Sequence, residues 1–273
     1  MKIGLALGGG GVRGLAHIPV LETLDDLGIK PDIIAGTSMG AIIGALYASG
    51  MSGKEIRERI SRILISKDDT WRDIVAKKSD LVKLVKAFSA EMPRGGFIKT
   101  QGFFEYLFHE IKKRTFEELE ISLLVIAADY WTAEEVVFEK GDLLPALQAS
   151  MAVPGVFAPV SIANKVLVDG GVVNLVPYDR LFKRADFTIA VDVSKVRNPG
   201  KNEIPGALES VLGAFNIMQA SALAEKMKIR RPDIYVQMEI QGIRMLDFSK
   251  TDEVFRQAVP AIAQLMNQLK DLK

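Results

Sequence analysis

The sequence predicts an α/β fold in which helices pack on a mostly parallel sheet. Short, continuous apolar runs typical of buried strands alternate with segments whose apolar residues recur at helical spacing. The first two strands each turn through glycines into a helix, and this βαβα order implies parallel strands joined by helices. The chain has 273 residues, of which 48% are hydrophobic, so a sizeable core can form. We expect one domain over residues 1–273.

Two strand–helix units open the chain. Residues 2–7 form the first expected strand and residues 15–27 the first helix, which Gly28 is expected to end as its C-cap. Residues 32–35 form the second expected strand, and residues 41–49 have helical character. The sequence therefore predicts that the turn after each strand lies at the same edge of the sheet.

Residues 51–115 interrupt this pattern and predict an inserted helical cap without a chemical motif of its own. The apolar residues between 81 and 88 are flanked by lysines, which fits either a helix on a membrane surface or an ordinary packed helix with a solvated face.

Strands and helices alternate again beyond the cap. Asp142 is expected to N-cap a helix, and the two prolines within 151–160 predict a loop. The remaining expected strands are 122–128, 136–138, 165–168, 187–193 and 233–240, and the remaining helices are 142–150, 208–227 and 253–272.

The turn after the second strand reads Gly-Thr-Ser-Met-Gly and has the pattern of a nucleophile elbow. Such a turn is strained, and it needs Gly36 and Gly40 because a Cβ at either position would collide with neighbouring backbone. The following helix directs its N-terminus, with free N–H groups, at Ser38. Ser38 is therefore the candidate nucleophile.

The turn after the first strand holds four consecutive glycines and admits three interpretations. Gly9-x-Gly11-x-x-Gly14 matches the dinucleotide-binding pattern, but that pattern needs an acid at the end of the second strand, and the nearest, Asp32, stands at its start. Alternatively, the glycine N–H groups form an oxyanion hole beside Ser38. A tight turn without chemistry is the third interpretation, and the number of glycines disfavours it.

A serine nucleophile needs a base, and the sequence offers few. Its only histidines are His17 and His109, so the order Ser, acid, His of α/β-hydrolases does not occur. Either histidine remains an alternative as the base. Asp169 is the better candidate because two glycines follow it and it ends a short apolar strand, which we expect to lie parallel to the strand before Ser38. A buried aspartate becomes a useful base when burial raises its pKa.

These motifs together resemble the patatin-like phospholipases. The matching motifs are Gly-Gly-Gly-x-Arg-Gly at 9–14, Gly-Thr-Ser-x-Gly at 36–40 and Asp-Gly-Gly at 169–171. The block 149–160, Asn174 and Pro177 also match positions around the family's aspartate. The resemblance covers residues 3–50 and 121–195 and is faint in the cap and the C-terminal third, so the substrate stays open.

The resemblance implies a three-layer α/β/α sandwich that hydrolyses fatty-acyl esters of phospholipids, lysophospholipids or neutral lipids. It implies a Ser–Asp dyad, an acyl-enzyme and no metal or cofactor. Ser38 would be the nucleophile and Asp169 the general base. The oxyanion loop would comprise Gly9, Gly10, Gly11, Arg13 and Gly14, and the turns beside the dyad would need Gly36, Gly40, Gly170 and Gly171.

Composition narrows the classes of function that remain possible. A net charge of +1 gives no basic excess for nucleic acid, and the absence of cysteine removes disulfides and thiol chemistry. The N-terminal apolar run is too short for a signal peptide, so we expect a cytoplasmic protein with peripheral membrane contact. A non-catalytic regulatory or scaffold protein of the same fold is the alternative, and the sequence leaves the oligomeric state and acyl transfer to acceptors other than water open.

Overall fold

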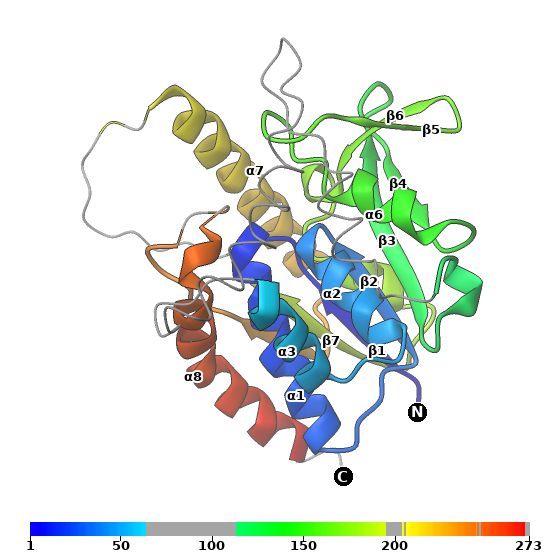
Figure 1. Cartoon of the computed structure of the whole chain (residues 1–273), viewed down its shortest axis with the longest axis vertical. Helices are drawn as coiled ribbons and strands as arrows, with labels where there is room; N and C mark the ends of the chain where they lie inside the picture. The colour runs from blue at the N-terminus through cyan, green and yellow to red at the C-terminus, as the bar shows by residue number, and fades with distance from the viewer. Residues whose placement is uncertain (64–112, 195–203, 205, 244, 246, 271–273) are drawn as a thin grey trace.

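The computed structural model describes residues 1–63, 113–194, 204, 206–243, 245 and 247–270. Its centre is an eight-stranded sheet with the order β5-β6-β3-β2-β1-β7-β8, and β4 pairs with β3 (Figure 1). Strands β3, β2, β1, β7 and β8 run parallel, whereas β4 and β6 pair antiparallel with β3, and β5 pairs antiparallel with β6. The strands are β1 (Ile3–Leu7), β2 (Ile33–Thr37), β3 (Ser122–Asp129), β4 (Glu135–Phe138), β5 (Val160–Ile162), β6 (Lys165–Asp169), β7 (Phe187–Asp192) and β8 (Ile234–Gln237).

One face of the sheet is covered by a layer of helices and holds the largest cluster of buried apolar side chains. This layer contains α1 (His17–Asp26), α2 (Met39–Ala48), α3 (Gly53–Ile63), α6 (Leu143–Ser150) and α8 (Thr251–Lys270) (Figure 1). Every residue of α2 is buried. The helix that follows Ser38 is therefore fixed on all sides.

The opposite face is covered by less regular structure. Residues 175–182, which include the 3₁₀ helix η4 (Tyr178–Leu181), pack there against Ala6, Ala35 and Leu124. Helix α7 (Ala207–Ile229) joins this cluster through Leu223. The described residues thus form helical and irregular layers on two sides of a mixed sheet.

Strand β3 is longer than its neighbour β2, and this difference brings two distant segments together. Thr37, the last residue of β2, pairs with Ile126, while Asp169, the last residue of β6, pairs with Ala127. Strand β4 occupies the other edge of β3 along this stretch. Strands β2 and β6 therefore meet end to end on one edge of β3, running toward each other.

This arrangement corrects one expectation. Asp169 does not end a parallel strand, because β6 runs antiparallel to β3. Strand β5, residues 160–162, was not expected, and it begins at the last residue of the expected loop. Asp142 is the N-cap residue of α6, as expected, but its side chain makes no capping hydrogen bond. The expected first helix begins with a 3₁₀ turn, η1 (Gly11–Ala16), and Gly28 follows it with φ 67°.

Most of the predicted cap, residues 64–112, lies outside the described residues, so the cap stays a prediction. Its described beginning, α3, packs Ile56 and Ile60 into the helical layer. The remaining short helices are η2 (Phe116–Glu118), η3 (Gly170–Val172) and η5 (Phe248–Lys250). Within the described ranges, no helix has both the length and the apolar character needed to cross a bilayer.

Candidate active site

Ser38 occupies a strained turn between β2 and α2. Its backbone has φ 55° and ψ −125°, a conformation that residues with a side chain rarely adopt. The two flanking glycines permit the turn: a Cβ at Gly36 would lie 2.5 Å from the Cα of Ala41, and one at Gly40 would lie 2.1 Å from the carbonyl oxygen of Leu7. Backbone crowding therefore requires glycine at both positions.

Hydrogen bonds hold the elbow from both sides. The backbone N–H of Ser38 donates to Oγ of the buried Ser150, at 2.9 Å. The carbonyl of Ser38 accepts from the N–H groups of Ala41 and Ile42. Ser150 lies in the block that resembles the family, but its contact with the elbow is visible only in the folded chain.

Asp169 ends β6 and continues directly into η3. Its Oδ1 accepts a hydrogen bond of 2.7 Å from the backbone N–H of Gly171, whereas its buried Oδ2 makes no hydrogen bond. Gly170 packs so closely on the end of β3 that a Cβ would lie 2.2 Å from the carbonyl oxygen of Ile126. Together these contacts fix the carboxylate and leave one of its oxygens free.

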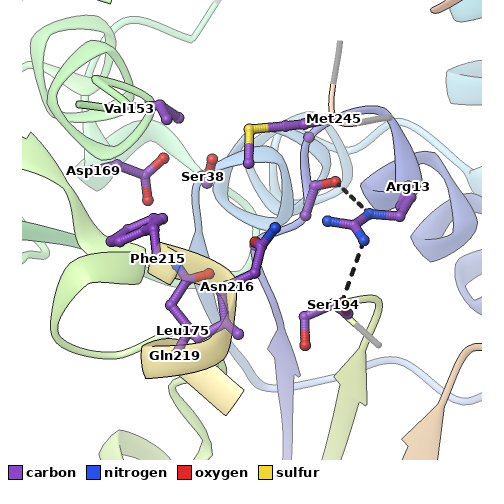
Figure 2. A pocket seen from close by; sticks show the side chains of 13 residues that line it. Arg13, Ser38, Val153, Asp169, Leu175, Ser194, Phe215, Asn216, Gln219 and Met245 are labelled. Carbon is purple, nitrogen blue, oxygen red and sulfur yellow. Dashed lines mark hydrogen bonds between the residues drawn. The ribbon is translucent and has the colours of Figure 1, made fainter. Parts of the chain in front are cut away.

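Burial controls the ionisation of Asp169. Loss of solvent raises the pKa of its carboxyl to about 6, although interaction with the Ser38 hydroxyl and the hydrogen bond from Gly171 lower the pKa. Figure 2 shows the two side chains beside each other at one end of the pocket. The carboxylate is therefore ionised near neutral pH but is a stronger base than an exposed aspartate.

The glycine loop runs past Ser38, and only some of its N–H groups are free. Gly8 and Gly9 donate to the carbonyls of Val191 and Leu175, both at 3.0 Å. The N–H groups of Gly10 and Gly11 have no acceptor among the described residues. Gly9 approaches Ser38 closely, since a Cβ on it would lie 3.3 Å from the Cβ of Ser38.

Arg13 braces this loop from inside the protein. Its Nε donates to the carbonyl of Gly10 at 3.2 Å, and its Nη1 donates to the carbonyl of Ser194 at 3.3 Å (Figure 2). Burial lowers the pKa of the guanidinium, and the charge of Asp192 opposes this shift. Gly14 makes room for Met39, whose side chain would lie 2.5 Å from an added Cβ.

One pocket joins these elements. It is lined by Gly9, Gly10, Gly11, Arg13, Ser38, Val153, Asp169, Leu175, Ser194, Phe215, Asn216, Gln219 and Met245. The α7 residues were not predicted as site residues, because an apolar helix late in the sequence gives no sign of where it packs. Among the described residues, no group of three His, Asp or Glu side chains is arranged to hold a metal ion.

His17 and Asp32, which the alternative interpretations of the sequence would use, contact other groups than the side chains of Ser38 and Asp169. His17 is fully buried, with Nε2 2.7 Å from the carbonyl oxygen of Gly8, and burial lowers the pKa of its imidazole to about 4. The neutral ring donates to the glycine loop, whereas His109 lies outside the described residues. Asp32 accepts from the N–H of Ile3, at the start of the strands and away from the glycine loop, so the residues that contact it do not support dinucleotide binding.

Comparison with known sequences finds relatives that are named as NTE family, patatin-like phospholipase or lysophospholipase proteins. An NTE family protein of Mycobacterium bovis is 27% identical over 98% of this chain and 47% of its own length. A patatin-like phospholipase domain-containing protein of Caenorhabditis elegans is 35% identical over 71% of this chain and 14% of its own. Lysophospholipase NTE1 of Kluyveromyces lactis is 26% identical over 93% of this chain and 18% of its own. The chain thus spans about half or less of these relatives.

The fold is also similar to a solved structure. VipD from Legionella pneumophila superposes with a TM-score of 0.52 and 12% identity, over 96% of this chain and 66% of that one. A sequence profile of the patatin-like phospholipase family matches residues 5–182, which include the elbow, the glycine loop and the Asp-Gly-Gly turn. The chain belongs to the patatin-like phospholipase family.

Proposed function

We propose that this protein is a serine acyl hydrolase in which Ser38 is the nucleophile and Asp169 the general base. The observation that carries the proposal is the carboxylate of Asp169. One oxygen is held by Gly171, the other is buried without a partner, and the Ser38 hydroxyl lies beside it. A buried acceptor without a partner is costly, and such groups occur where a reaction uses them.

The reaction follows from these positions. Asp169 takes the proton of Ser38 Oγ as that oxygen attacks the carbonyl carbon of an ester. The carbonyl oxygen becomes negative and accepts hydrogen bonds from the free N–H groups of Gly10 and Gly11, while Gly9 shapes the loop. When the C–O bond to the alcohol breaks, the alcohol leaves with the proton from Asp169. Water then attacks the acyl-enzyme by the same route and releases the fatty acid.

Other loop residues act on the oxyanion site indirectly. Arg13 fixes the Gly10 carbonyl and adds positive charge near the developing oxyanion. His17 holds the Gly8 carbonyl as a neutral donor, and its low pKa makes it a poor base. The dyad Ser38–Asp169 therefore needs no histidine.

Family membership supports a lipid acyl ester as the substrate. The fungal relative named a lysophospholipase supports a substrate with a single acyl chain, and the cap, if it lines the acyl groove, sets the acyl length. Acyl transfer to an alcohol other than water uses the same first half-reaction. A non-catalytic scaffold of this fold has no use for an unpartnered Asp169 oxygen.

Labelling with a fluorophosphonate probe tests the proposal. We expect the probe to modify Ser38, as identified by peptide mass mapping, and to leave Ser38→Ala unlabelled. We expect labelling to be at least tenfold slower in Asp169→Asn, because the amide cannot take the proton. An unlabelled but folded wild-type protein would favour the scaffold alternative.

We further propose that the protein contacts lipid surfaces with the side that holds the pocket. Exposed apolar side chains in segments next to the site support the proposal: Tyr130 and Trp131 in the turn between β3 and β4, Val172 in η3 directly after the Asp-Gly-Gly turn, and Ile217 and Met218 on α7, the helix that lines the pocket. Trp131 is 78% exposed, and such aromatic side chains favour membrane interfaces. In flotation with phosphatidylcholine and phosphatidylglycerol vesicles, Trp131→Ala with Met218→Ser should reduce binding severalfold. Val259→Ser, which removes an exposed apolar side chain of α8, should not.

A further inference from the structure

The walls of the pocket differ in chemistry along its length. Three apolar side chains, Val153, Leu175 and Phe215, lie on the side of Ser38 and Asp169, together with the occupied carboxamide of Gln219 (Figure 2). Arg13, Ser194 and Asn216 lie toward the other side, together with the single apolar side chain of Met245. An ester bound at Ser38 therefore has apolar contacts available to one part and polar contacts to another. A saturated acyl chain matches the apolar side, and the alcohol half of the ester then faces the polar side.

Helix α7 contributes two carboxamides to this pocket, those of Asn216 and Gln219. Both lie in residues 210–224, a stretch without charged side chains. Gln219 donates from Nε2 to the carbonyl of Gly171 at 2.9 Å, and the same Gly171 donates to Asp169. Gln219 is therefore occupied in holding the loop of the general base.

Asn216, one helical turn before Gln219, has a different environment. Its carboxamide lines the pocket and points toward the space between Ser38 and Arg13 (Figure 2). Within the part of the chain that the structure describes, this carboxamide has no hydrogen-bond partner. A half-buried amide that faces a pocket without a partner is available to a ligand.

We propose that Asn216 binds the substrate by hydrogen-bonding an oxygen in the alcohol half of the ester, close to the scissile bond. The inference rests on the proposed acyl hydrolase function and adds a specificity-determining residue to it. A carboxamide both donates and accepts, so it fits a glycerol hydroxyl and a phosphate oxygen alike. Because α7 carries Asn216, the C-terminal third of the chain selects the alcohol half, although the catalytic motifs lie elsewhere.

The test compares Asn216→Leu with the wild type on three esters of equal acyl length. A p-nitrophenyl ester has neither a hydroxyl nor a phosphate in its alcohol half, a monoacylglycerol has hydroxyls, and a lysophosphatidylcholine has a hydroxyl and a phosphate. We expect kcat/KM to fall about 10-fold more for the two glycerol esters than for the p-nitrophenyl ester, mainly through KM. A fall confined to lysophosphatidylcholine would identify the phosphate as the bound oxygen, and a fall in both would identify the hydroxyl. Ser221→Ala, on the exposed side of α7, is the matched control.

Two results would overturn the inference. One is an equal loss on all three esters, which would mean that Asn216 only supports the fold, and the other is no loss on any. A binding measurement separates this inference from the proposed reaction: in a Ser38→Ala background, Asn216→Leu should weaken lysophosphatidylcholine binding about 10-fold by calorimetry. If the wild type cleaves no ester, the reaction is wrong, and the binding comparison still decides the role of Asn216.

Discussion

Asp169 combines two opposing requirements in one side chain. Its Oδ1 is held by the Gly171 N–H, while burial of the whole carboxyl raises its pKa to about 6. An exposed aspartate, with a pKa of ~3.9, would be a much weaker base. The protein thus has a carboxylate that is ionised at neutral pH yet basic enough to receive a proton from serine, at a cost in stability.

The acid side of the pH–rate profile follows from this pKa. If Asp169 must be ionised to accept the Ser38 proton, kcat/KM should fall about tenfold per pH unit below about 6 and level off above it. Hydrolysis of a water-soluble ester between pH 4.5 and 8 measures this, with circular dichroism to check that the fold persists. A profile that stays flat down to pH 5 would contradict the assignment of Asp169 as the base.

The same pKa predicts how stability depends on pH. Between about pH 4 and 6 the folded protein holds a proton on Asp169 that the unfolded chain has lost, so stability falls as pH rises through this window. Asp169→Asn removes the ionisation while its Oδ1 still accepts from Gly171. We expect the variant to gain up to about 3 kcal/mol over the wild type at pH 7.5 and much less at pH 4.5. Urea unfolding at both pH values measures the gain, and equal stabilities at both would refute the prediction.

At the scale of elements, the site depends on two strands that meet end to end. Strand β3 extends past the end of β2, and β6 fills the vacated edge from the opposite direction. Ser38 and the Asp169 turn therefore follow strand ends that pair with adjacent residues of β3. Gly36, Gly40 and Gly170 have little freedom, because each packs against backbone, whereas a Cβ at Gly171 would meet the side chain of Gln219 at 2.5 Å.

Two alanine substitutions in helices should act in opposite directions. At Gly40, a Cβ would lie 2.1 Å from the Leu7 carbonyl oxygen and would push α2 away from β1, so Gly40→Ala should cost several kcal/mol of folding stability or prevent folding. At Gly213, within α7, nothing lies within 4 Å of an added Cβ, so Gly213→Ala should stabilise by about 0.5–1 kcal/mol. Thermal unfolding of both variants measures this. A mild effect at Gly40 would show that β1 and α2 yield where we expect them to be rigid.

At the scale of the whole molecule, α7 connects the pocket to the layer on the second face of the sheet. Gln219 donates to the carbonyl of Gly171, whose N–H donates to Asp169. Near the other end of the helix, Lys226 donates from Nζ to Asn174, Val176 and Asp179 at 2.6 to 2.7 Å. These contacts hold α7 against the segment that follows the Asp-Gly-Gly turn, so the position of the helix depends on that segment.

Removal of the Lys226 amine should loosen α7 without touching the dyad. Lys226→Met leaves Asp179 and two further acceptors without their donor, and we expect a loss of about 1–3 kcal/mol. Hydrogen exchange of α7 amides should become faster than in the wild type. Lys228→Met is the control, because among the described residues its exposed amine pairs with the exposed Glu225 alone. Equal exchange in the two variants would mean that α7 is held by its apolar contacts alone.

The sequence was sufficient for much of the fold but not for its irregular parts. Apolar runs identified the buried strands β1, β2, β3 and β7, because a strand covered on both faces must be apolar throughout. Strand β5 was missed, since three residues next to prolines give no periodic pattern. The role of Asn174 was also hidden: its side chain bonds not only the nearby Asp179 but also Glu135 and Lys226, which are distant in sequence.

The sequence alone was enough to name the candidate site residues, since a strained turn needs glycine at fixed offsets and these offsets are visible along the chain. It marked Ser38, Asp169 and the glycine loop. How these residues meet became visible only in the folded chain. Strand β6 runs antiparallel to β3, and the N–H of Gly9 donates to the carbonyl of Leu175. Helix α7 brings Asn216 and Gln219 into the pocket. The physical reason is that pairing direction, hydrogen-bond partners and helix packing depend on contacts between distant segments, which no local pattern records.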